Sequence, residues 1–325
     1  MARQMVIAGG GIGGLAAALS GARAGWNVRL HERTSAFAEV GAGIQIGPNV
    51  TRVLQNWGLS AALESVAAFP ERLEVRDAVS GGERGVLRLG ATARTRYGAP
   101  YATVHRADLL ELLLSGLRQQ TDAAMLLGSA VVGFADKPQG VVVQTTTGPV
   151  DCDALLGADG LWSTVRQSLL GDGSPRATGH AAYRALVPQS ALGESLRSQQ
   201  VTVWLGRRLH VVQYPVRRGE WLNVVAILQD DARADAGTNA LASASASACE
   251  RAEGRTGAPA KDSEASADWN LPADRARLRR ALAASCPALR TLVDAIDSWQ
   301  RWTLFDRASV RAAAELARGR VGLLG

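Results

Sequence analysis

The stretch that decides the fold is Met5 to Glu32, which reads MVIAGGGIGGLAAALSGARAGWNVRLHE. A short apolar run is followed by a glycine-rich turn, an alanine- and leucine-rich segment of helical length, and a second apolar segment that ends in an acid. That order predicts a strand, a turn, a helix and a parallel strand. Gly9, Gly11 and Gly14 fit the pattern G-x-G-x-x-G, whose glycines allow a tight turn, the approach of a pyrophosphate and close packing of the helix. The stretch therefore predicts a dinucleotide-binding site.

The acid at the end of this stretch supports the same interpretation. Glu32 lies at the tip of the second strand, where a carboxylate can accept hydrogen bonds from ribose hydroxyls. The alternative is a targeting segment, because residues 5–22 carry no charge and follow Arg3. The six glycines of that run disfavour a stable apolar helix, and a cleaved leader has no need of a strand with a polar tip. We therefore prefer the dinucleotide site.

The composition indicates a globular protein with two domains or subdomains. Of the 325 residues, 47% are hydrophobic and 20% are charged, and this length suffices for a large core. The net charge is +6, and the basic excess comes from arginines that are scattered along the chain. Scattered basic residues are typical of a solvated surface, so we expect no nucleic-acid and no membrane partner. The sequence leaves both a monomer and a homodimer open. A basic surface also suits a small aromatic carboxylate as substrate.

The cysteines give a further indication of the class of protein. The chain has three, Cys152, Cys249 and Cys286, which lie far apart and form no C-x-x-C pair. This pattern argues against a disulfide framework and against a zinc site, so we expect no metal. It is consistent with a reducing, cytoplasmic location.

The first half of the chain continues with alternating helix and strand patterns. Strands are predicted at 73–77 and 85–89 in a small meander, and a helix is predicted from 106 to about 119 because its leucines share one side. A hairpin is predicted at 131–146. A buried strand then runs into Asp159-Gly160, after which Ser163 is expected to cap a short helix.

From residue 182 onward, strand patterns dominate. Alternating segments within 183–229 predict an antiparallel sheet inserted in the nucleotide-binding domain. Residues 230–268 form a low-complexity insertion of Ala, Ser, Asp and Glu. Helices are predicted at 275–285 and 288–296, an extended segment at 299–307, and a final buried strand at 319–325.

Three motifs in this order resemble the single-component FAD-dependent aromatic hydroxylases of the p-hydroxybenzoate hydroxylase superfamily. The glycine turn with Glu32 is similar to the family's motif for the ADP part of FAD. The segment H-R-x-D-L at 105–109 is similar to the one whose arginine lies on the flavin side. The segment D-G-x-x-S-x-V-R at 159–166 is similar to the one that serves both FAD and the pyridine nucleotide. The resemblance is strongest to the branch with 3-hydroxybenzoate 6-hydroxylase and salicylate hydroxylase, and it covers nearly the whole chain except 230–268.

Pattern and resemblance together predict an α/β fold, with a Rossmann-like FAD-binding domain and an inserted antiparallel β-sheet substrate domain. The FAD-binding domain is expected at 1–180, with the small β meander at about 70–105. The substrate domain is expected at 181–300 and contains the low-complexity insertion. Residues 301–325 return to the FAD-binding domain.

The resemblance also implies the cofactors, which are FAD and either NADH or NADPH, with O2 as co-substrate. The residues that it implies as cofactor contacts are Gly9, Gly11, Gly13, Gly14, Glu32, Arg33, Gly43, Gln45, Arg106, Val131, Asp159 and Arg166.

The substrate site is expected on the strand pattern at 209–216. His210 and Tyr214 point to the same face of a strand, because side chains alternate along it. From the residues alone, an ordinary strand pair with backbone partners is the simpler interpretation. The resemblance instead implies that both contact the substrate, with His210 easing removal of a phenolic proton, and it adds Gln300 as a weaker substrate contact.

The end of the chain departs from the family pattern. In the family, the last strand continues into G-D-A-A-H-P, whose aspartate binds the ribityl chain of FAD, whereas this sequence ends at Gly325. We therefore expect an incomplete, C-terminally truncated FAD-binding domain.

Several functions remain open from the sequence. The first is hydroxylation of a small phenolic acid such as 3-hydroxybenzoate, to gentisate, and the alternatives are a salicylate hydroxylase or an inactive truncated flavoprotein fragment. A plain nicotinamide dehydrogenase is disfavoured, because it would not need the second motif at Asp159-Gly160.

Overall fold

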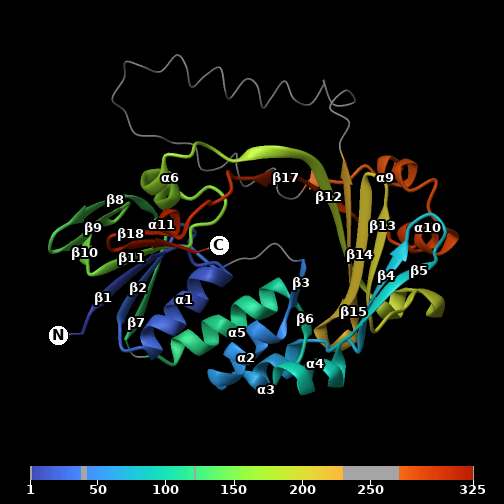
Figure 1. Ribbon diagram of the computed structural model, residues 1–325, viewed down its shortest axis with the longest axis horizontal. Coiled ribbons are helices and arrows are strands. Elements are labelled where there is room, and N and C mark those ends of the chain that lie inside the picture. Colours follow the sequence, from blue (N-terminus) through green and yellow to red (C-terminus); the bar gives the residue numbers. More distant parts are fainter. Residues whose placement is uncertain (1, 38–41, 121, 230–270, 325) are drawn as a thin grey trace, which may run out of the picture.

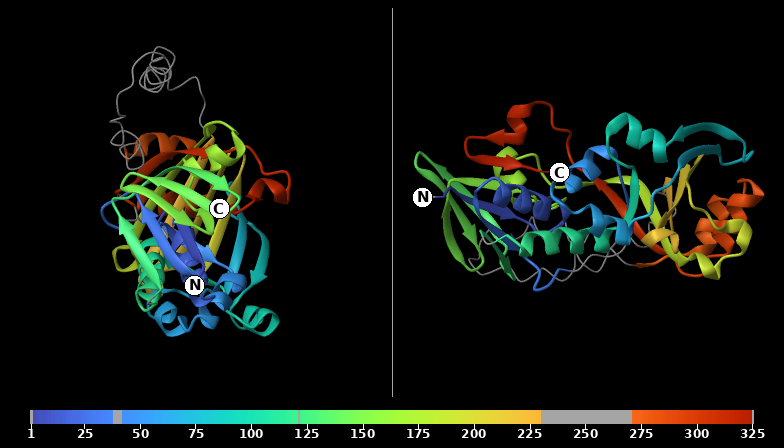
Figure 2. Two further views of the ribbon diagram at one scale, coloured as in Figure 1. Left: turned by 90° about the vertical axis from the view of Figure 1, so that its left-hand side faces the viewer. Right: turned by 90° about the horizontal axis from the view of Figure 1, so that it is seen from below.

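The structure is a computed structural model that describes residues 2–37, 42–120, 122–229 and 271–324. It has two lobes, one built on a mainly parallel sheet and the other on a large mixed sheet (Figure 1). Viewed from below, the two lobes lie side by side along the longest axis (Figure 2). The low-complexity insertion expected at 230–268 lies outside the described residues.

The first lobe contains the predicted βαβ unit in a six-stranded sheet. Its strands, in the order across the sheet, are β18 (Ala317–Arg318), β19 (Val321–Leu323), β11 (Ala154–Gly157), β1 (Gln4–Ala8), β2 (Asn27–Glu32) and β7 (Ala123–Leu127). All neighbours pair in parallel except β18 and β19. Because β1 and β11 are parallel neighbours, the turns that follow them lie at the same edge of the sheet.

The two faces of this sheet are covered by different layers. Ile7 packs with Leu15 and Leu19 of helix α1 (Ile12–Arg23) and with the leucines of α5 (Arg106–Arg118). Its neighbour Val6 packs on the other face, against a three-stranded antiparallel sheet. The strands of that sheet are β8 (Val131–Lys137), β9 (Gly140–Thr145) and β10 (Gly148–Cys152). The alternation along β1 therefore buries the strand on both sides, which explains its unbroken apolar sequence.

The second lobe is an eight-stranded sheet. In order across the sheet, its strands are β16 (Leu271–Pro272), β17 (Gln300–Asp306), β12 (Arg176–Pro188), β15 (Trp221–Gln229), β14 (Leu209–Val216), β13 (Val201–Gly206), β4 (Arg72–Asp77) and β5 (Glu83–Arg88). The long strand β12 begins beside the first lobe and extends across the top of the molecule into this sheet (Figure 1). One face of the sheet is covered by α9 (Arg275–Ala281) and α10 (Pro287–Asp294).

The strands expected as a meander of the FAD-binding domain lie elsewhere. β4 and β5 do form a hairpin, but β4 pairs in parallel with β13, so the hairpin is the edge of the large sheet. The physical reason is its apolar face: Leu73 of β4 packs with Val201 and Tyr214 of the large sheet.

The remaining elements connect the lobes or cap the first one. The two-stranded sheet β3 (Gly43–Ile46) and β6 (Ala102–His105) lies between them. The remaining helices are α2 (Pro48–Asn56), α3 (Ser60–Val66), α4 (Gly90–Tyr97), α6 (Thr164–Leu170) and α11 (Ala313–Leu316), with short 3-10 turns at Gln189–Ala191, Glu194–Leu196 and Arg217–Gly219. Within the described ranges, no helix has the length and apolar composition needed to span a bilayer.

Candidate active site

The glycine turn between β1 and α1 has the shape that a bound dinucleotide requires. Gly9 has φ of +99°, and a Cβ there would lie 2.4 Å from the carbonyl oxygen of Ala158. A Cβ on Gly14 would lie 1.8 Å from the carbonyl oxygen of Gly9. These two glycines are therefore required by packing. By contrast, a Cβ on Gly11 or Gly13 would meet no described atom within 4 Å, which leaves open space at the start of α1.

The start of α1 can hold a phosphate group. Its N-cap is Gly11, which has no side chain to cap the helix. The first N–H groups of the helix and its dipole therefore face the open space beside the turn, which is the arrangement that binds pyrophosphates. The residues present thus fit the diphosphate of FAD.

The tip of β2 lies beside the same turn. Glu32 Oε2 accepts a hydrogen bond from the Gly10 N–H at 2.6 Å, and its Oε1 accepts one from the Thr34 N–H at 2.8 Å. The exposed Arg33 lies next to it. The segment that leads to Val131 passes here too, because the Ser129 N–H donates to the Glu32 carbonyl at 2.9 Å. The structure therefore brings Glu32, Arg33 and the start of β8 to the glycine turn.

The second motif meets the turn from the neighbouring strand. Asp159 Oδ2 accepts a hydrogen bond from the Val165 N–H at 3.1 Å, and its Oδ1 accepts one from the Ser163 hydroxyl. Ser163 caps α6, as predicted, by accepting a hydrogen bond from the Arg166 N–H at 2.9 Å. The Asp159 carboxylate therefore holds the start of α6 in place, and the Asp159 backbone lies against Gly9, since a Cβ on Gly9 would be 2.8 Å from Asp159 Cα.

The Arg166 side chain takes part in an ion pair with Asp172. Its Nε donates to Asp172 Oδ2 at 2.7 Å, and the guanidinium of Arg307 donates to Asp172 Oδ1 at 2.7 Å. The hydrogen bond from Arg166, together with Arg307, lowers the pKa of Asp172 below its ordinary value. The structure thus assigns the Arg166 side chain to the junction of α6 with the segment after β17.

The predicted substrate contacts lie on one face of the large sheet. On β14, His210 pairs with Ile227 of β15 and Tyr214 pairs with Asn223 of β15. Ile227 in turn pairs with Ala182 of β12. Gln300 of β17 pairs with Arg184, also of β12. Since paired residues point to the same side and alternate along each strand, His210, Tyr214 and Gln300 share a face.

That face is the one that meets the FAD-binding lobe. Asn223 Oδ1 accepts a hydrogen bond from the Gly43 N–H at 2.7 Å, and Asn223 is 1% exposed. A Cβ on Gly43 would lie 2.5 Å from Cε2 of the Tyr214 ring. Glycine at position 43 is therefore required for β3 to approach the sheet this closely.

Charged and aromatic side chains surround Tyr214. Burial raises the pKa of Tyr214 well above its ordinary value, and nearby Tyr101 adds to this, while the charges of Arg184 and Arg106 oppose it. Burial also raises the pKa of Tyr101 to about 12, and the Tyr101 hydroxyl donates to Gln45 Oε1. Both phenols are therefore protonated at neutral pH and can donate hydrogen bonds.

These two arginines, Arg106 and Arg184, contribute positive charge at this junction. The Arg106 N–H donates to the Ala42 carbonyl at 2.9 Å, which places the start of α5 beside β3. The guanidinium of Arg184 lies over the ring of Trp302. A carboxylate next to Tyr214 would therefore find a favourable potential.

His210 is half-buried at the other end of the same face. Burial lowers its pKa from the ordinary value, and the charge of nearby His180 lowers it further. The neutral imidazole is therefore the main form at pH 7, and it can accept a proton.

Several residues of the site escape sequence reasoning. Asn223 and Tyr101 stand in strand-like surroundings without any motif, and Asp172 lies outside the D-G-x-x-S-x-V-R segment. The one weak signal is Asn223 within an otherwise apolar strand, because a buried asparagine needs a specific hydrogen-bond partner. No cluster of three or more candidate metal ligands occurs in the part of the chain that is described.

Comparison with known proteins agrees with this geometry. The sequence model of the FAD binding domain family matches residues 3–325. The 3-hydroxybenzoate 6-hydroxylase of Polaromonas naphthalenivorans (strain CJ2) is 31% identical over 323 residues, which cover 99% of this chain and 72% of that protein. A protein of the same name from Klebsiella oxytoca is 39% identical over 228 residues, which cover 69% of this chain and 57% of that protein.

A solved structure shows the same fold. Klebsiella pneumoniae HpxO, complexed with FAD and uric acid, has a TM-score of 0.74 and 25% sequence identity, with 99% of this chain and 72% of that chain covered. The predicted α/β fold, with its Rossmann-like FAD-binding domain, is thereby confirmed. The chain belongs to the FAD binding domain family, among the flavoprotein aromatic hydroxylases of the p-hydroxybenzoate hydroxylase type.

Proposed function

We propose that this chain is the FAD- and substrate-binding part of a monooxygenase that hydroxylates a small phenolic acid such as 3-hydroxybenzoate, using O2 and NADH or NADPH. The observation that carries the proposal is the shared face of His210, Tyr214 and Gln300 opposite Gly43. Relatives named 3-hydroxybenzoate 6-hydroxylase support the choice of ring substrate.

The residues of the first lobe would hold FAD. Gly11 and Gly13 would leave room for the diphosphate at the start of α1, and Glu32 beside the glycine turn would accept hydrogen bonds from the ribose hydroxyls. Gly43, Gln45 and Arg106 lie where β3 meets the large sheet, beside the substrate face. When bound, FAD supplies the redox chemistry, namely acceptance of a hydride from the nicotinamide and activation of O2.

The residues of the large sheet would bind and activate the ring. The protonated hydroxyl of Tyr214 donates a hydrogen bond to the substrate, and the charges of Arg184 and Arg106 favour its carboxylate. A neutral imidazole nitrogen of His210 accepts the phenolic proton, which makes the ring more electron-rich. Packing of β3 against β14 excludes water from this junction.

The first experiment is the visible absorbance of the purified 325-residue protein, before and after FAD is added. Flavin bands that remain with the protein after gel filtration are the expected result, because the glycine turn is intact. Consumption of NADH or NADPH is then compared with 3-hydroxybenzoate and with salicylate, and the product is identified by mass spectrometry. Gentisate from 3-hydroxybenzoate supports the proposal, whereas catechol from salicylate would replace it with the other branch.

A further inference from the structure

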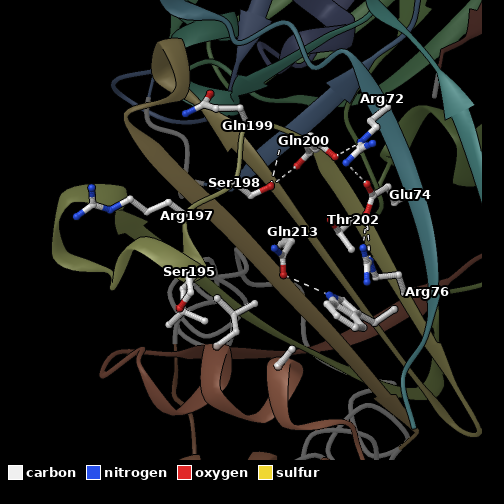
Figure 3. A pocket seen from close by; sticks show the side chains of 14 residues that line it. Arg72, Glu74, Arg76, Ser195, Arg197, Ser198, Gln199, Gln200, Thr202 and Gln213 are labelled. Atoms are coloured by element: carbon white, nitrogen blue, oxygen red, sulfur yellow. Dashed lines mark hydrogen bonds and ion pairs between the residues drawn. The ribbon is translucent and has the colours of Figure 1, made fainter. Parts of the chain in front are cut away.

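A second pocket lies on the opposite face of the large sheet from the candidate active site. It is an open pocket lined by β4, β13, β14, the segment 195–200 and helix α10, and its volume is about 350 Å³ (Figure 3). Small-molecule sites in proteins begin at about this size. Neither the FAD-binding motifs nor the substrate face contributes to its lining.

The strand register builds the floor of the pocket from polar residues. Glu74, Thr202 and Gln213 occupy the same level on β4, β13 and β14, so they form a row across three neighbouring strands. Their exposed fractions are 4%, 6% and 8%. This row is unusual, because the same face of β12 and β15 is apolar and covered by α9 and α10.

Two polar groups of the floor are available to a ligand, namely the Gln213 amide nitrogen and the Thr202 hydroxyl. Gln213 Oε1 accepts a hydrogen bond from Trp204 Nε1 at 3.2 Å. An indole N–H can only donate, so this bond fixes the amide and leaves Gln213 Nε2 as a donor. The structure gives neither Nε2 nor the Thr202 hydroxyl a hydrogen-bond partner among the described residues. Both groups face the pocket, where they can donate hydrogen bonds to the acceptor atoms of a ligand in place of water.

The charges of the lining also favour an acceptor. Arg72, Arg76 and Arg197 line the pocket together with one acid, Glu74. Glu74 binds Arg72 at 2.6 Å and Arg76 at 3.0 Å, while the exposed Arg197 lies at the rim. One carboxylate does not neutralise three guanidiniums, so the pocket has an excess of positive charge.

One wall of the pocket is apolar, while the segment 195–200 adds further polar side chains. Ala288 and Leu292 of α10 supply this apolar part of the lining, and the Trp204 side chain, which is hydrogen-bonded to Gln213, adds its ring. A ligand that fills this volume must therefore combine an anionic end with an apolar body.

We propose that this pocket binds a small organic carboxylate. Its oxygens accept hydrogen bonds from Gln213 Nε2 and the Thr202 hydroxyl, and its apolar body lies against Leu292 and Trp204. The site is separate from the proposed active site, because Gln213 and Tyr214 are consecutive on β14 and point to opposite faces. The proposal therefore holds whether or not the chain hydroxylates a phenol.

The test uses benzoate and its neutral analogue benzamide as probes. In the 15N-labelled protein, the Trp204 indole and the Gln213 side-chain amide are followed by NMR during each titration. Benzoate is expected to shift both resonances to saturation, and benzamide is expected to bind about tenfold more weakly, because it lacks the charge. Shifts around His210 and Tyr214 report the other face and are fitted separately.

Three variants make the result specific. Gln213→Glu adds a second carboxylate to the floor, so it should weaken benzoate binding about tenfold or more. Thr202→Val preserves shape and removes the hydroxyl, so it should weaken binding with the fold intact. Arg84→Gln removes an arginine of the neighbouring strand β5 that is 65% exposed and lies outside the pocket, and should change nothing. The proposal is overturned if benzoate causes no saturable shift, if benzamide binds as tightly, or if Arg84→Gln weakens binding as much as the pocket variants do.

Discussion

At the scale of the residue, the glycines of the nucleotide turn divide into two kinds. Gly9 and Gly14 are held by the close approach of other backbone atoms, whereas Gly11 and Gly13 border open space. The pattern G-x-G-x-x-G contains Gly9, Gly11 and Gly14 and predicts their separate roles, whereas Gly13 lies outside the pattern and only the structure shows its open surroundings. Gly9 and Gly14 are therefore needed for packing, whereas Gly11 and Gly13 leave room for a ligand.

This division predicts opposite effects of the same substitution. Gly14→Ala places a Cβ 1.8 Å from the Gly9 carbonyl oxygen and should lower the free energy of unfolding by about 2 kcal/mol or more. Gly13→Ala, in the same helix, meets no described atom and should raise it by up to about 1 kcal/mol, because alanine favours helix. Urea unfolding measures both. Equal destabilisation by the two variants would contradict the assigned roles.

The protonation of His210 gives a second prediction at this scale. Burial and the charge of His180 lower its pKa, so the imidazole remains neutral as the pH falls through the ordinary histidine value of about 6.5. A base must be unprotonated to act, so the hydroxylation rate should fall at low pH. This acid limb of the pH profile should lie below the ordinary histidine value. His180→Gln removes one cause and should move the limb toward higher pH, whereas His31→Gln, in the first lobe, should not.

NMR titration of the His210 ring protons checks the same pKa without any turnover. A limb that stays in place when His180 is replaced, while the His210 ring titrates at a higher pH, would show that another group is the base.

At the scale of the element, the junction of α6 with the end of β17 depends on one carboxylate. Asp172 binds Arg166 and Arg307, and these bonds lower its pKa. A carboxyl whose pKa is lowered by folding stabilises the fold above its unfolded pKa, and this contribution is lost as the pH falls through the folded pKa. The stabilisation should therefore be complete at neutral pH and decline only below the ordinary carboxyl range.

Asp172→Asn tests this contribution. The variant should unfold at lower temperature than the parent at pH 7, and the difference should shrink as the pH is lowered below about 4. Asp306→Asn is the matched control, because Asp306 is 54% exposed and pairs only with the exposed Arg176 among the described residues. Its effect should stay within about 0.5 kcal/mol. A difference for Asp172→Asn that is independent of pH would contradict the ion-pair assignment.

The sequence predicts an element well when local patterns determine it, and poorly when its position depends on pairing with residues far away in the chain. The βαβ unit, the Ser163 cap of α6 and the strands of 183–229 follow from local patterns, and the structure contains them. The hairpin β4–β5 was predicted as strands but assigned to the other domain. Its parallel pairing with β13 joins residues more than a hundred positions apart, and local alternation carries no information about such a partner.

The candidate site shows the same limit. Alternation along β14 predicts that His210 and Tyr214 share a face, but the level of Gln300 depends on the register of β17 with β12. The polar row of the second pocket depends on three strand registers at once, so no single segment of sequence indicates it.

At the scale of the whole molecule, three of the hydrogen-bonded contacts that join the two lobes lie close together. Asn223 accepts a hydrogen bond from the Gly43 N–H, the Thr103 hydroxyl donates to the Pro215 carbonyl, and Arg217 binds both oxygens of Asp108 at 3.0 and 3.2 Å. All three lie around β14, which carries the proposed substrate contacts, and around the start of α5, which follows β6. The relative position of the FAD-binding lobe and the substrate face is therefore fixed by the same contacts that build the site.

Such a junction predicts that the two lobes unfold together. Circular dichroism and tryptophan fluorescence should report one coincident thermal transition, because separating the lobes leaves buried hydrogen-bonding groups without partners. Asn223→Ala leaves the Gly43 N–H without its acceptor and should lower the free energy of unfolding by about 1–3 kcal/mol. Asn56→Ala, at an exposed position on α2, should change it by no more than about 0.5 kcal/mol. Two separate transitions in the unaltered protein would show that the junction does not couple the lobes, and that β3 is free to leave the substrate face without unfolding of either sheet.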